Sequence, residues 1–384
     1  MKILIIGFGI TGKKLYEYLK ETDDEIYIYD ENIVSNDIYN YEKLLNKQIY
    51  FDLGIKSPGI RKNTKEYELI SILCKEIISE IDYSYLKLKT ENIIGVTGSN
   101  GKTTFVEFLY EFFSLKYKTF LGGNIGIPLI ELVNKVDKDD YIILELSSFQ
   151  LEDSKYLKLK KAFITSLSPN HLNYYDNVNH YYASKNRIKL FSNNVVCLNN
   201  YKFNNNFNLT ELVGSYNNLY KKIAFNEAYK HGVELSKLVI KEKDLKLDIY
   251  RLNGPYYIKN FIIVNDSKST SSEATLYAYN TFKNYKIILI LGGNHKSDSF
   301  AKIKVRDGDI VLIYGYSKDK IKTEINGIIF DTLAEIINYI SHLKDEYLIL
   351  FSPGCDSHDQ FKNYIDRGNE FNKLIKRYIG DFDE

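Results

Sequence analysis

Residues 92–104 read NIIGVTGSNGKTT, in which an apolar stretch runs into a loop of small residues and then into the start of a helix. Consecutive backbone amides in such a loop can surround phosphate oxygens, Lys102 can reach the β and γ phosphates of a nucleotide, and the Thr103 hydroxyl can ligate Mg²⁺. The strict Walker spacing requires glycine where Val96 stands, and Gly95 comes one residue early. The strand–loop–helix context still favours a phosphate-binding loop over a surface turn with a solvated lysine.

Short apolar runs alternate with helical patterns on both sides of this loop. Helices are expected at residues 13–20 and 103–113. Strands are expected at residues 2–6, 25–29, 92–96, 141–146, 162–166, 286–291, 310–314 and 347–351, with another starting near Phe261. This βαβ order predicts parallel sheets that are covered by helices on both faces.

The alternation restarts twice along the chain, near Glu91 and near Lys243. We therefore expect an α/β protein of three domains, at residues 1–90, 91–242 and 243–384. The asparagine-rich segment 193–208 is expected to be a loop.

A second glycine motif lies at the N-terminus, where residues 7–12 read GFGITG directly after the first expected strand. The first glycine allows the tight turn, the second lets backbone approach a phosphate, and the third lets helix and strand pack closely. Asp30 ends the second expected strand, close to where a ribose-binding acid sits in such folds. The motif indicates a nucleotide or dinucleotide site, without distinguishing a redox cofactor from another diphosphate.

Composition excludes several classes of protein. The 384 residues include 51 Lys and Arg against 50 Asp and Glu, so the basic surplus of a nucleic-acid-coating protein is absent. Hydrophobic residues make up 44% of the chain, which argues against intrinsic disorder. Three distant cysteines favour a reducing, cytoplasmic location over a disulfide framework, and the apolar runs are too short to cross a membrane.

Three polar residues are considered for metal binding and acid–base work, and two of them lie near expected strand ends. Glu145 ends the strand at 141–146, where a carboxylate is well placed for Mg²⁺ beside a phosphate loop. His171 follows the next expected strand. Lys185 lies in a helical pattern and, taken alone, would be a solvated lysine.

The last third of the chain carries three polar turns, each after an expected strand. They read NDSKST at 265–270, LGGNHK at 291–296 and SPGCDS at 352–357. Turns at the carboxyl ends of strands form a crevice in an open α/β sheet, and their lysines and hydroxyls suit a carboxylate-bearing substrate. Cys355 has no evident activating base, so we interpret it as a small buried residue.

Taken together, these motifs resemble the Mur ligases, the ATP-dependent amide-forming enzymes of peptidoglycan precursor synthesis. Within that family the NDSKST block at 265–270 and the last block at 352–371 are most similar to the members that add D-glutamate to UDP-N-acetylmuramoyl-L-alanine. The resemblance runs in order through GFGITG at 7–12, SPGI at 57–60, GVTGSNGKTT at 95–104, GGNIGIPL at 122–129, LELSSFQLE at 144–152, SPNHLN at 168–173, YYASKNRI at 181–188, NDSKST at 265–270, LGGNHKS at 291–297 and SPGCDSHDQFKNYIDRGNEF at 352–371.

The resemblance implies roles for individual residues. The catalytic group would be Lys102, Glu145, His171 and Lys185. ATP would be bound by Gly98, Ser99, Asn100, Gly101, Lys102, Thr103, Thr104, Asn217 and Asp266. Two Mg²⁺ ions would be held by Thr103, Glu145, His171 and a carbamylated Lys185. The UDP substrate would be bound by Ile10, Thr11, Asp30, Gly59 and Asn124, and the amino acid by Lys268, Thr270, Lys296, Ser357 and Tyr364.

The resemblance also implies an arrangement and a chemistry. A Rossmann-like UDP-binding domain, a central ATPase domain of the phosphate-loop type and a Rossmann-like amino-acid domain would follow one another. The substrate carboxylate would be activated as an acyl phosphate and then attacked by the amine of D-glutamate. We expect a monomer that acts on these small molecules, without nucleic acid and without insertion into a membrane.

Some positions depart from the family pattern. Asn170 and Asn173 stand where an aspartate is usual, Tyr216 replaces a histidine, and Tyr364 replaces a phenylalanine. A His-Arg pair that contacts ATP is absent, and Asp244-Leu245 occupies its place. Three alternatives therefore stay open: a Mur-type ligase for another amino acid, a non-catalytic nucleotide-binding descendant, and, from the first glycine motif alone, a nicotinamide oxidoreductase.

Overall fold

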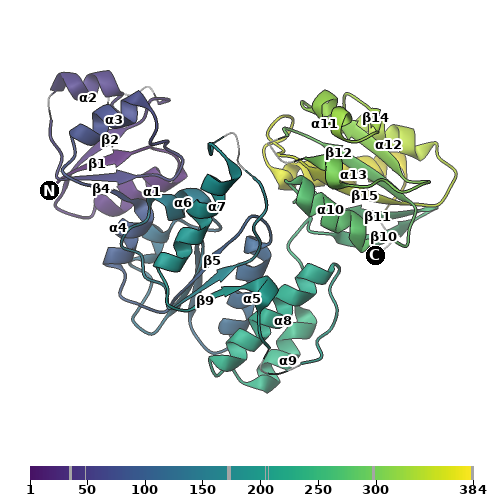
Figure 1. The fold of residues 1–384 in the computed structure, drawn as a ribbon, viewed down its shortest axis with the longest axis horizontal. Helices are drawn as coiled ribbons and strands as arrows, with labels where there is room; N and C mark the ends of the chain where they lie inside the picture. Colours follow the sequence, from purple (N-terminus) through teal and green to yellow (C-terminus); the bar gives the residue numbers. More distant parts are fainter. Residues whose placement is uncertain are drawn as a thin grey trace. The chain divides into compact units, whose positions relative to one another are not determined.

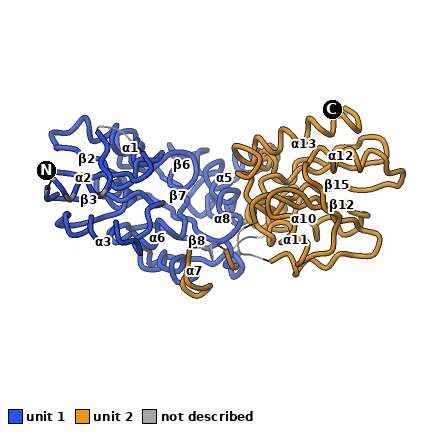
Figure 2. The backbone as a smooth tube through the Cα atoms, turned by 90° about the horizontal axis from the view of Figure 1, so that it is seen from above, with its two compact units in different colours: residues 1–167, 182–206, 223–241 blue, residues 168–181, 207–222, 242–384 orange. Residues whose placement is uncertain are grey.

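The computed structural model describes residues 1–33, 37–47, 49–170, 174–203, 205, 207–295 and 299–381. The chain divides into two compact units (Figure 2). Unit 1 contains residues 1–167, 182–206 and 223–241, and unit 2 contains residues 168–181, 207–222 and 242–384. Unit 1 carries two sheets and unit 2 carries a third (Figure 1).

The first sheet of unit 1 has the strand order β2-β1-β3-β4 and is entirely parallel. Its strands are β1 (Lys2–Ile6), β2 (Glu25–Tyr29), β3 (Leu53–Lys56) and β4 (Ile77–Ser79), and its helices are α1 (Ile10–Leu19), α2 (Tyr41–Lys47), α3 (Lys65–Ile72) and α4 (Glu80–Lys87). Alternate residues of β1 enter different cores: Ile3 and Ile5 pack with α1 and α4, whereas Leu4 and Ile6 pack with α2 and α3. This explains the unbroken apolar run, because both faces of the strand are buried.

The second sheet of unit 1 has the order β6-β7-β5-β8-β9 and is also parallel. Its strands are β5 (Ile93–Thr97), β6 (Thr119–Gly123), β7 (Tyr141–Glu145), β8 (Lys161–Ile164) and β9 (Val195–Cys197). The helices of this part of the chain are α5 (Lys102–Phe113), α6 (Ser148–Asp153), α7 (Val178–Asn186), α8 (Ser215–Lys230) and α9 (Leu235–Asp244). α5 packs on the sheet through Phe105, whose ring meets that of Phe163 edge-on at a centroid distance of 5.1 Å.

The expectation of a loop over residues 193–208 is wrong for its first half. Residues Val195–Cys197 form the edge strand β9, which pairs with β8, and a 3₁₀ turn follows at Leu198–Asn200. Val195 and Val196 are β-branched and suit a strand, and this local preference prevails over the asparagines around them.

The sheet of unit 2 has the order β10-β11-β15-β12-β13-β14, in which only β10 is antiparallel to its neighbour. Its strands are β10 (Asn253–Ile258), β11 (Phe261–Asn265), β12 (Ile287–Gly292), β13 (Ile310–Tyr314), β14 (Ile328–Ile329) and β15 (Tyr347–Gly354). Its helices are α10 (Ser272–Thr281), α11 (Lys318–Glu324), α12 (Leu333–Ser341) and α13 (Tyr364–Tyr378). The core on one face includes α12 and α13, and the core on the other includes α10 and α11.

The predicted α/β class with mostly parallel sheets is confirmed. All three cysteines are free, and Cys355 is fully buried, as its interpretation as a packing residue required. Among the described residues, no helix combines the length and the apolar character that a membrane span needs.

Candidate functional site

The phosphate loop lies between β5 and α5, and the end of β8 holds its backbone in place. The amide of Ser99 donates to the carbonyl of Ser166 at 2.8 Å, and the amide of Asn100 donates to the Ser166 hydroxyl at 3.0 Å. Gly98 has a φ of +150°, and a Cβ at this position would come within 1.9 Å of the Thr165 hydroxyl. A glycine is therefore required here because the loop is packed directly against the neighbouring strand end.

Lys102 and Lys185 reach the same backbone oxygen of this loop. The Lys102 ammonium donates to the carbonyl of Gly98 at 2.9 Å, and the Lys185 nitrogen donates to it at 2.8 Å. Lys185 is only 2% exposed. Burial lowers the pKa of Lys185 well below its ordinary value, the positive charge of Lys102 lowers it further, and Glu145 opposes both effects. This environment favours a neutral amine at Lys185.

Glu145 lies at the end of β7 with both carboxylate oxygens engaged. The Thr103 hydroxyl donates to Oε2 at 2.9 Å, and the Asn124 amide donates to Oε1 at 2.8 Å. Glu145 is 2% exposed, so it is held at the side of the loop and away from bulk water. A carboxylate and a hydroxyl are hard oxygen ligands of the kind that Mg²⁺ prefers, so Glu145 and Thr103 fit that ion.

Most of the residues predicted for the phosphate side are therefore brought together in unit 1. Lys102, Thr103, Glu145 and Lys185 surround one loop, and Asn124, which was predicted for the UDP substrate, joins them through Glu145. The predicted metal ligand His171 lies outside the described residues. Within the described part of the chain, no group of three acidic, histidine or cysteine side chains forms a metal site.

The N-terminal glycine loop is built around Asp30. The Asp30 carboxylate, 8% exposed, accepts the amide of Phe8 at 2.8 Å and the amide of Asn32 at 2.9 Å. The Ser57 hydroxyl donates to the carbonyl of Gly7 at 2.9 Å, which joins the SPGI turn to this loop. A Cβ on Gly59 would meet no atom within 4 Å, so the turn presents an open backbone surface.

Ile10 and Thr11 open helix α1, directly after the glycine turn. Ile10 is 78% exposed, which is unusual for a large apolar side chain. The backbone amides at a helix start favour an anion such as a diphosphate. The geometry is therefore compatible with a nucleotide at this turn.

In unit 2, the three polar turns follow β11, β15 and β12, which are neighbouring parallel strands. The turns are also joined directly: the amide of Asn294 donates to the carbonyl of Asp356 at 2.9 Å, and the amide of Gly354 donates to that of Ser269 at 3.2 Å. The predicted convergence of these turns at one sheet edge is confirmed. Lys296 lies outside the described residues.

Arg367 of α13 organises two of these turns, and the sequence analysis did not single it out. It is fully buried, and its guanidinium donates to the carbonyls of Cys355 at 2.9 Å and Ser267 at 2.7 Å and to the Ser267 hydroxyl at 3.1 Å. The Ser267 hydroxyl in turn donates to the carbonyl of Tyr364 at 2.8 Å. Arg367 lies inside a quoted motif, but an arginine in an amphipathic helix gives no sign that it is buried.

The predicted amino-acid residues take different positions around these turns. Lys268 forms an ion pair with Asp248, and its nitrogen lies 5.5 Å from the centre of the Tyr364 ring. Ser357 is buried, whereas Thr270 is half-buried.

Asp266, predicted for ATP, is buried and accepts the Ser352 hydroxyl at 2.8 Å and the amide of Leu252 at 3.1 Å. Burial raises the pKa of Asp266 to about 6, although Arg251 and the two hydrogen bonds lower it. The Asn217 amide donates to the carbonyl of Val213 at 2.6 Å, also within unit 2.

Comparisons with known proteins agree with this arrangement. Residues 96–265 match the Mur ligase middle domain. The chain is 31% identical to the UDP-N-acetylmuramoylalanine–D-glutamate ligase of Francisella tularensis subsp. novicida (strain U112), and the match covers 97% of this chain and 95% of that protein. The protein of the same name from Francisella tularensis subsp. tularensis (strain WY96-3418) is 30% identical over the same shares.

Solved structures show the same fold at low identity. The UDP-N-acetylmuramate-alanine ligase MurC from Thermotoga maritima has a TM-score of 0.58 at 17% identity, over 98% of this chain and 99% of that chain. A pseudomurein peptide ligase type C from Methanothermus fervidus has a TM-score of 0.59 at 15% identity over the same shares. The near-full-length identity to the Francisella proteins, together with the middle-domain match, shows that this chain belongs to the Mur ligase family.

Proposed function

We propose that the chain is an ATP-dependent ligase that joins D-glutamate to UDP-N-acetylmuramoyl-L-alanine in peptidoglycan precursor synthesis. The observation that carries the proposal is the convergence of Lys102, Thr103, Glu145 and Lys185 on one phosphate loop. The names of the Francisella relatives support the choice of substrates.

The reaction has two steps, and the residues around the phosphate loop carry out the first. An oxygen of the substrate carboxylate attacks the γ phosphorus of ATP, the bond to the β–γ bridging oxygen breaks, and ADP leaves. Backbone amides of the loop and the Lys102 ammonium stabilise the charge on the transferred phosphoryl group. When bound, Mg²⁺ would be held by Thr103 and Glu145 and would neutralise further phosphate charge.

The second step forms the amide. The amine of D-glutamate attacks the acyl carbon, phosphate leaves, and one proton is released. In unit 2, Lys268 and Thr270 would bind the carboxylates of D-glutamate, with Lys296, Ser357 and Tyr364 completing the site. Asn217 and Asp266 would contact the nucleoside of ATP.

The uridine diphosphate would bind at the N-terminal glycine loop, on Ile10, Thr11, Asp30 and Gly59. Asn124, which contacts Glu145, would face the muramoyl part of the substrate. The three sheets then correspond to three domains, at residues 1–90, 91–242 and 243–384. We place the protein in the cytoplasm, as a monomer that acts on small molecules.

Lys185 would be carbamylated in the active enzyme, and with His171 it would hold a second Mg²⁺. Carbamylation joins the neutral amine to CO₂ and releases one proton. The burial of Lys185, which favours that neutral amine, supports this assignment. Incubation with ¹³C-bicarbonate should give a carbamate carbon signal that is absent from a Lys185→Met variant.

The test of the proposed function uses the purified full chain with ATP, MgCl₂, D-glutamate and UDP-N-acetylmuramoyl-L-alanine. ADP and the dipeptide product are measured together, and L-glutamate, glycine and L-alanine replace D-glutamate in parallel. Product with D-glutamate alone is the expected result. Preference for another amino acid would reassign the substrate, and binding of the UDP substrate without any ADP release would indicate a non-catalytic descendant.

A further inference from the structure

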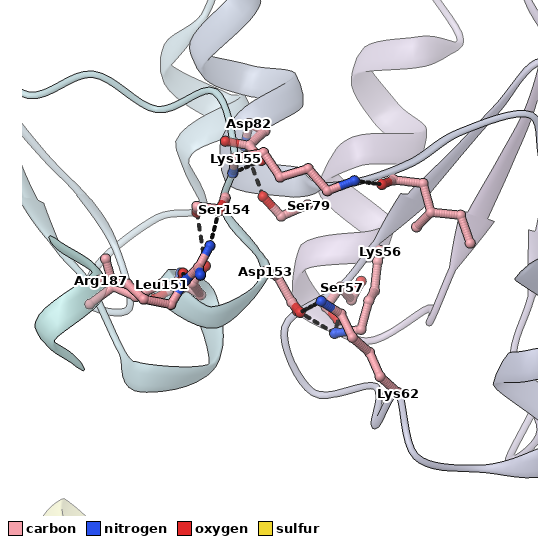
Figure 3. A network of polar contacts seen from close by, with 12 residues as sticks. Lys56, Ser57, Lys62, Ser79, Asp82, Leu151, Asp153, Ser154, Lys155 and Arg187 are labelled. Carbon is pink, nitrogen blue, oxygen red and sulfur yellow. Dashed lines mark hydrogen bonds and ion pairs between the residues drawn. The ribbon is translucent and has the colours of Figure 1, made fainter. Parts of the chain in front are cut away.

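Residues 151–157, which form the end of α6 and the start of its connection to β8, are contacted by three separate parts of unit 1 (Figure 3). Asp153 at the end of α6 forms an ion pair with Lys56, and its second oxygen lies 2.6 Å from the nitrogen of Lys62. Lys56 is 2% exposed and Asp153 is 7% exposed, so this pair is buried. Lys56 ends β3 of the first sheet, and Asp153 ends α6, which connects β7 and β8 of the second sheet. The pair therefore joins the first sheet to a helix of the second.

A second contact to residues 151–157 comes from an aspartate of helix α4, which follows the first sheet. Asp82 of α4 accepts three consecutive backbone amides, those of Lys155 at 2.7 Å, Tyr156 at 3.0 Å and Leu157 at 3.0 Å. The Ser79 hydroxyl caps α4 by accepting the amide of Asp82 at 3.1 Å. These contacts fix the backbone of the connection independently of Asp153.

The third contact comes from Arg187, two residues after Lys185. The Arg187 guanidinium donates to the carbonyl of Leu151 at 2.9 Å and to the carbonyl of Ser154 at 2.8 Å. Residues 151–157 therefore connect both sheets to the segment next to Lys185.

The positions of these residues along the chain link two parts of the proposed site. Lys56 directly precedes the SPGI turn, and its nitrogen also donates to the carbonyl of Ser57 at 3.3 Å. Asp153 ends the short helix α6, which starts three residues after Glu145. The buried pair thus joins the turn proposed for the uridine diphosphate to the helix that follows the proposed Mg²⁺ ligand.

We propose that Lys56 and Asp153 are positioning residues, which set the orientation of the uridine-diphosphate turn relative to the phosphate loop. This inference rests on the proposed function. A substrate that is bound at both places has one length, so its carboxylate reaches the γ phosphate only when the two sheets keep one relative orientation. A misplacement of about 1 Å can cost roughly 100-fold in rate even when it originates far from the reacting atoms.

The charges of Lys56 and Asp153 are better explained by a positioning role than by a contribution to stability. Taking a lysine and an aspartate out of water is costly, and apolar replacements of similar volume are often equally stable. A buried ion pair does, however, repay its desolvation only within a narrow range of geometries, and buried polar groups are attested as devices that fix register. The turn itself is also held by the Ser57 hydroxyl, which donates to the carbonyl of Gly7 at 2.9 Å, a shorter bond than the 3.3 Å one from Lys56 to the Ser57 carbonyl.

The experiment compares Lys56→Met, the double variant Lys56→Met/Asp153→Leu and Lys75→Met in the full chain. Lys75 is a matched control, because it also pairs with an aspartate, Asp52, but is 75% exposed. Three quantities are measured: the Kd of UDP, the Kd of ATP, and kcat/KM for the UDP-sugar substrate. The melting temperature identifies variants that do not fold. The double variant keeps the test possible if Lys56→Met does not fold, because it removes both charges of the buried pair.

We expect UDP and ATP to bind all variants within twofold of the unchanged protein, while kcat/KM falls roughly tenfold or more in both Lys56 variants and not in Lys75→Met. Unchanged kcat/KM in a folded Lys56 variant would overturn the inference. Loss of UDP binding would also overturn it, because Lys56 would then act on the turn alone. If the unchanged protein binds both nucleotides and makes no product, the proposed function fails, which is a different result from either.

Discussion

The Thr103 hydroxyl donates a hydrogen bond of 2.9 Å to Glu145, which joins the first turn of α5 to the end of β7 across 42 residues of sequence. β5 and β7 are neighbouring parallel strands, so the loop after one and the acid at the end of the other meet at the same sheet edge. Two oxygen-bearing side chains that we propose as Mg²⁺ ligands thus lie beside the phosphate loop.

Glu145→Gln should remove most of the metal-dependent activity while the fold is kept. The amide matches the carboxylate in shape, but it lacks the charge that holds a divalent ion. We expect ADP release to fall about 100-fold and the required Mg²⁺ concentration to rise. A magnesium titration of ADP release measures both.

Glu227→Gln is the matched control, because Glu227 is equally buried but pairs with Lys161 and Tyr201. It should lower the melting temperature, since Lys161 loses its buried partner, and leave the magnesium dependence unchanged. An Mg²⁺ requirement that shifts equally in both variants would contradict the assignment of Glu145.

Lys185→Met should separate stability from activity. The substitution removes a buried amine whose pKa burial lowers, and replaces it with an apolar chain of similar length. We expect a free energy of unfolding that is unchanged or about 1 kcal/mol higher, with at least a roughly 100-fold loss of product formation. Lys189→Met, at an exposed position four residues on, should change neither quantity. A less stable Lys185→Met that keeps full activity would show that this lysine has only a structural role.

The repeating architecture was accessible from sequence because buried parallel strands are written as continuous apolar runs. Three strands have the predicted bounds, namely Lys2–Ile6, Glu25–Tyr29 and Ile310–Tyr314. β10 was missed, because its sequence NGPYYI contains glycine and proline and its burial is irregular. It is an edge strand, where proline is tolerated.

The site was accessible to the extent that its residues stand at strand ends. Glu145 and the glycine loops do so, and their positions follow from sheet geometry. Lys185 and Arg367 do not: both lie in helices, and their burial depends on which helix face packs inward. The same holds for Lys56 and Asp153, whose pairing joins the end of strand β3 to the end of helix α6 across 97 residues of sequence.

Asp266 should make the stability of the protein depend on pH between about 4 and 6. Burial raises its pKa to about 6 in the folded chain, against an ordinary value of 3.8. Between these values the folded state binds more protons than the unfolded state, so the free energy of unfolding falls as pH rises and levels off above about 6. The shift of about two pKa units corresponds to about 3 kcal/mol.

Asp266→Asn should remove this dependence, because the amide cannot ionise. Melting curves at pH 4.5, 5.5 and 7 compare the variant with the unchanged protein, and the gain in stability of the variant should grow with pH. Asp52→Asn is the control, because Lys75 lowers the pKa of the partly exposed Asp52, which therefore stays ionised over this range. A constant difference between Asp266→Asn and the unchanged protein would refute the assignment.

Gly12→Ala should lower the stability of the protein, whereas Gly9→Ala should weaken UDP binding and leave the stability nearly unchanged. A Cβ on Gly12 would lie 2.0 Å from the carbonyl oxygen of Gly7, a backbone atom that cannot move away alone, whereas a Cβ on Gly9 would meet nothing within 4 Å. Gly12→Ala should therefore cost about 2 kcal/mol or more of unfolding free energy. Gly9→Ala should leave stability within about 0.5 kcal/mol and weaken UDP binding, because the added methyl stands where a phosphate would approach the backbone. Chemical denaturation and calorimetric titration with UDP measure the two quantities. UDP binding that survives Gly9→Ala unchanged would mean that the diphosphate does not lie on this turn.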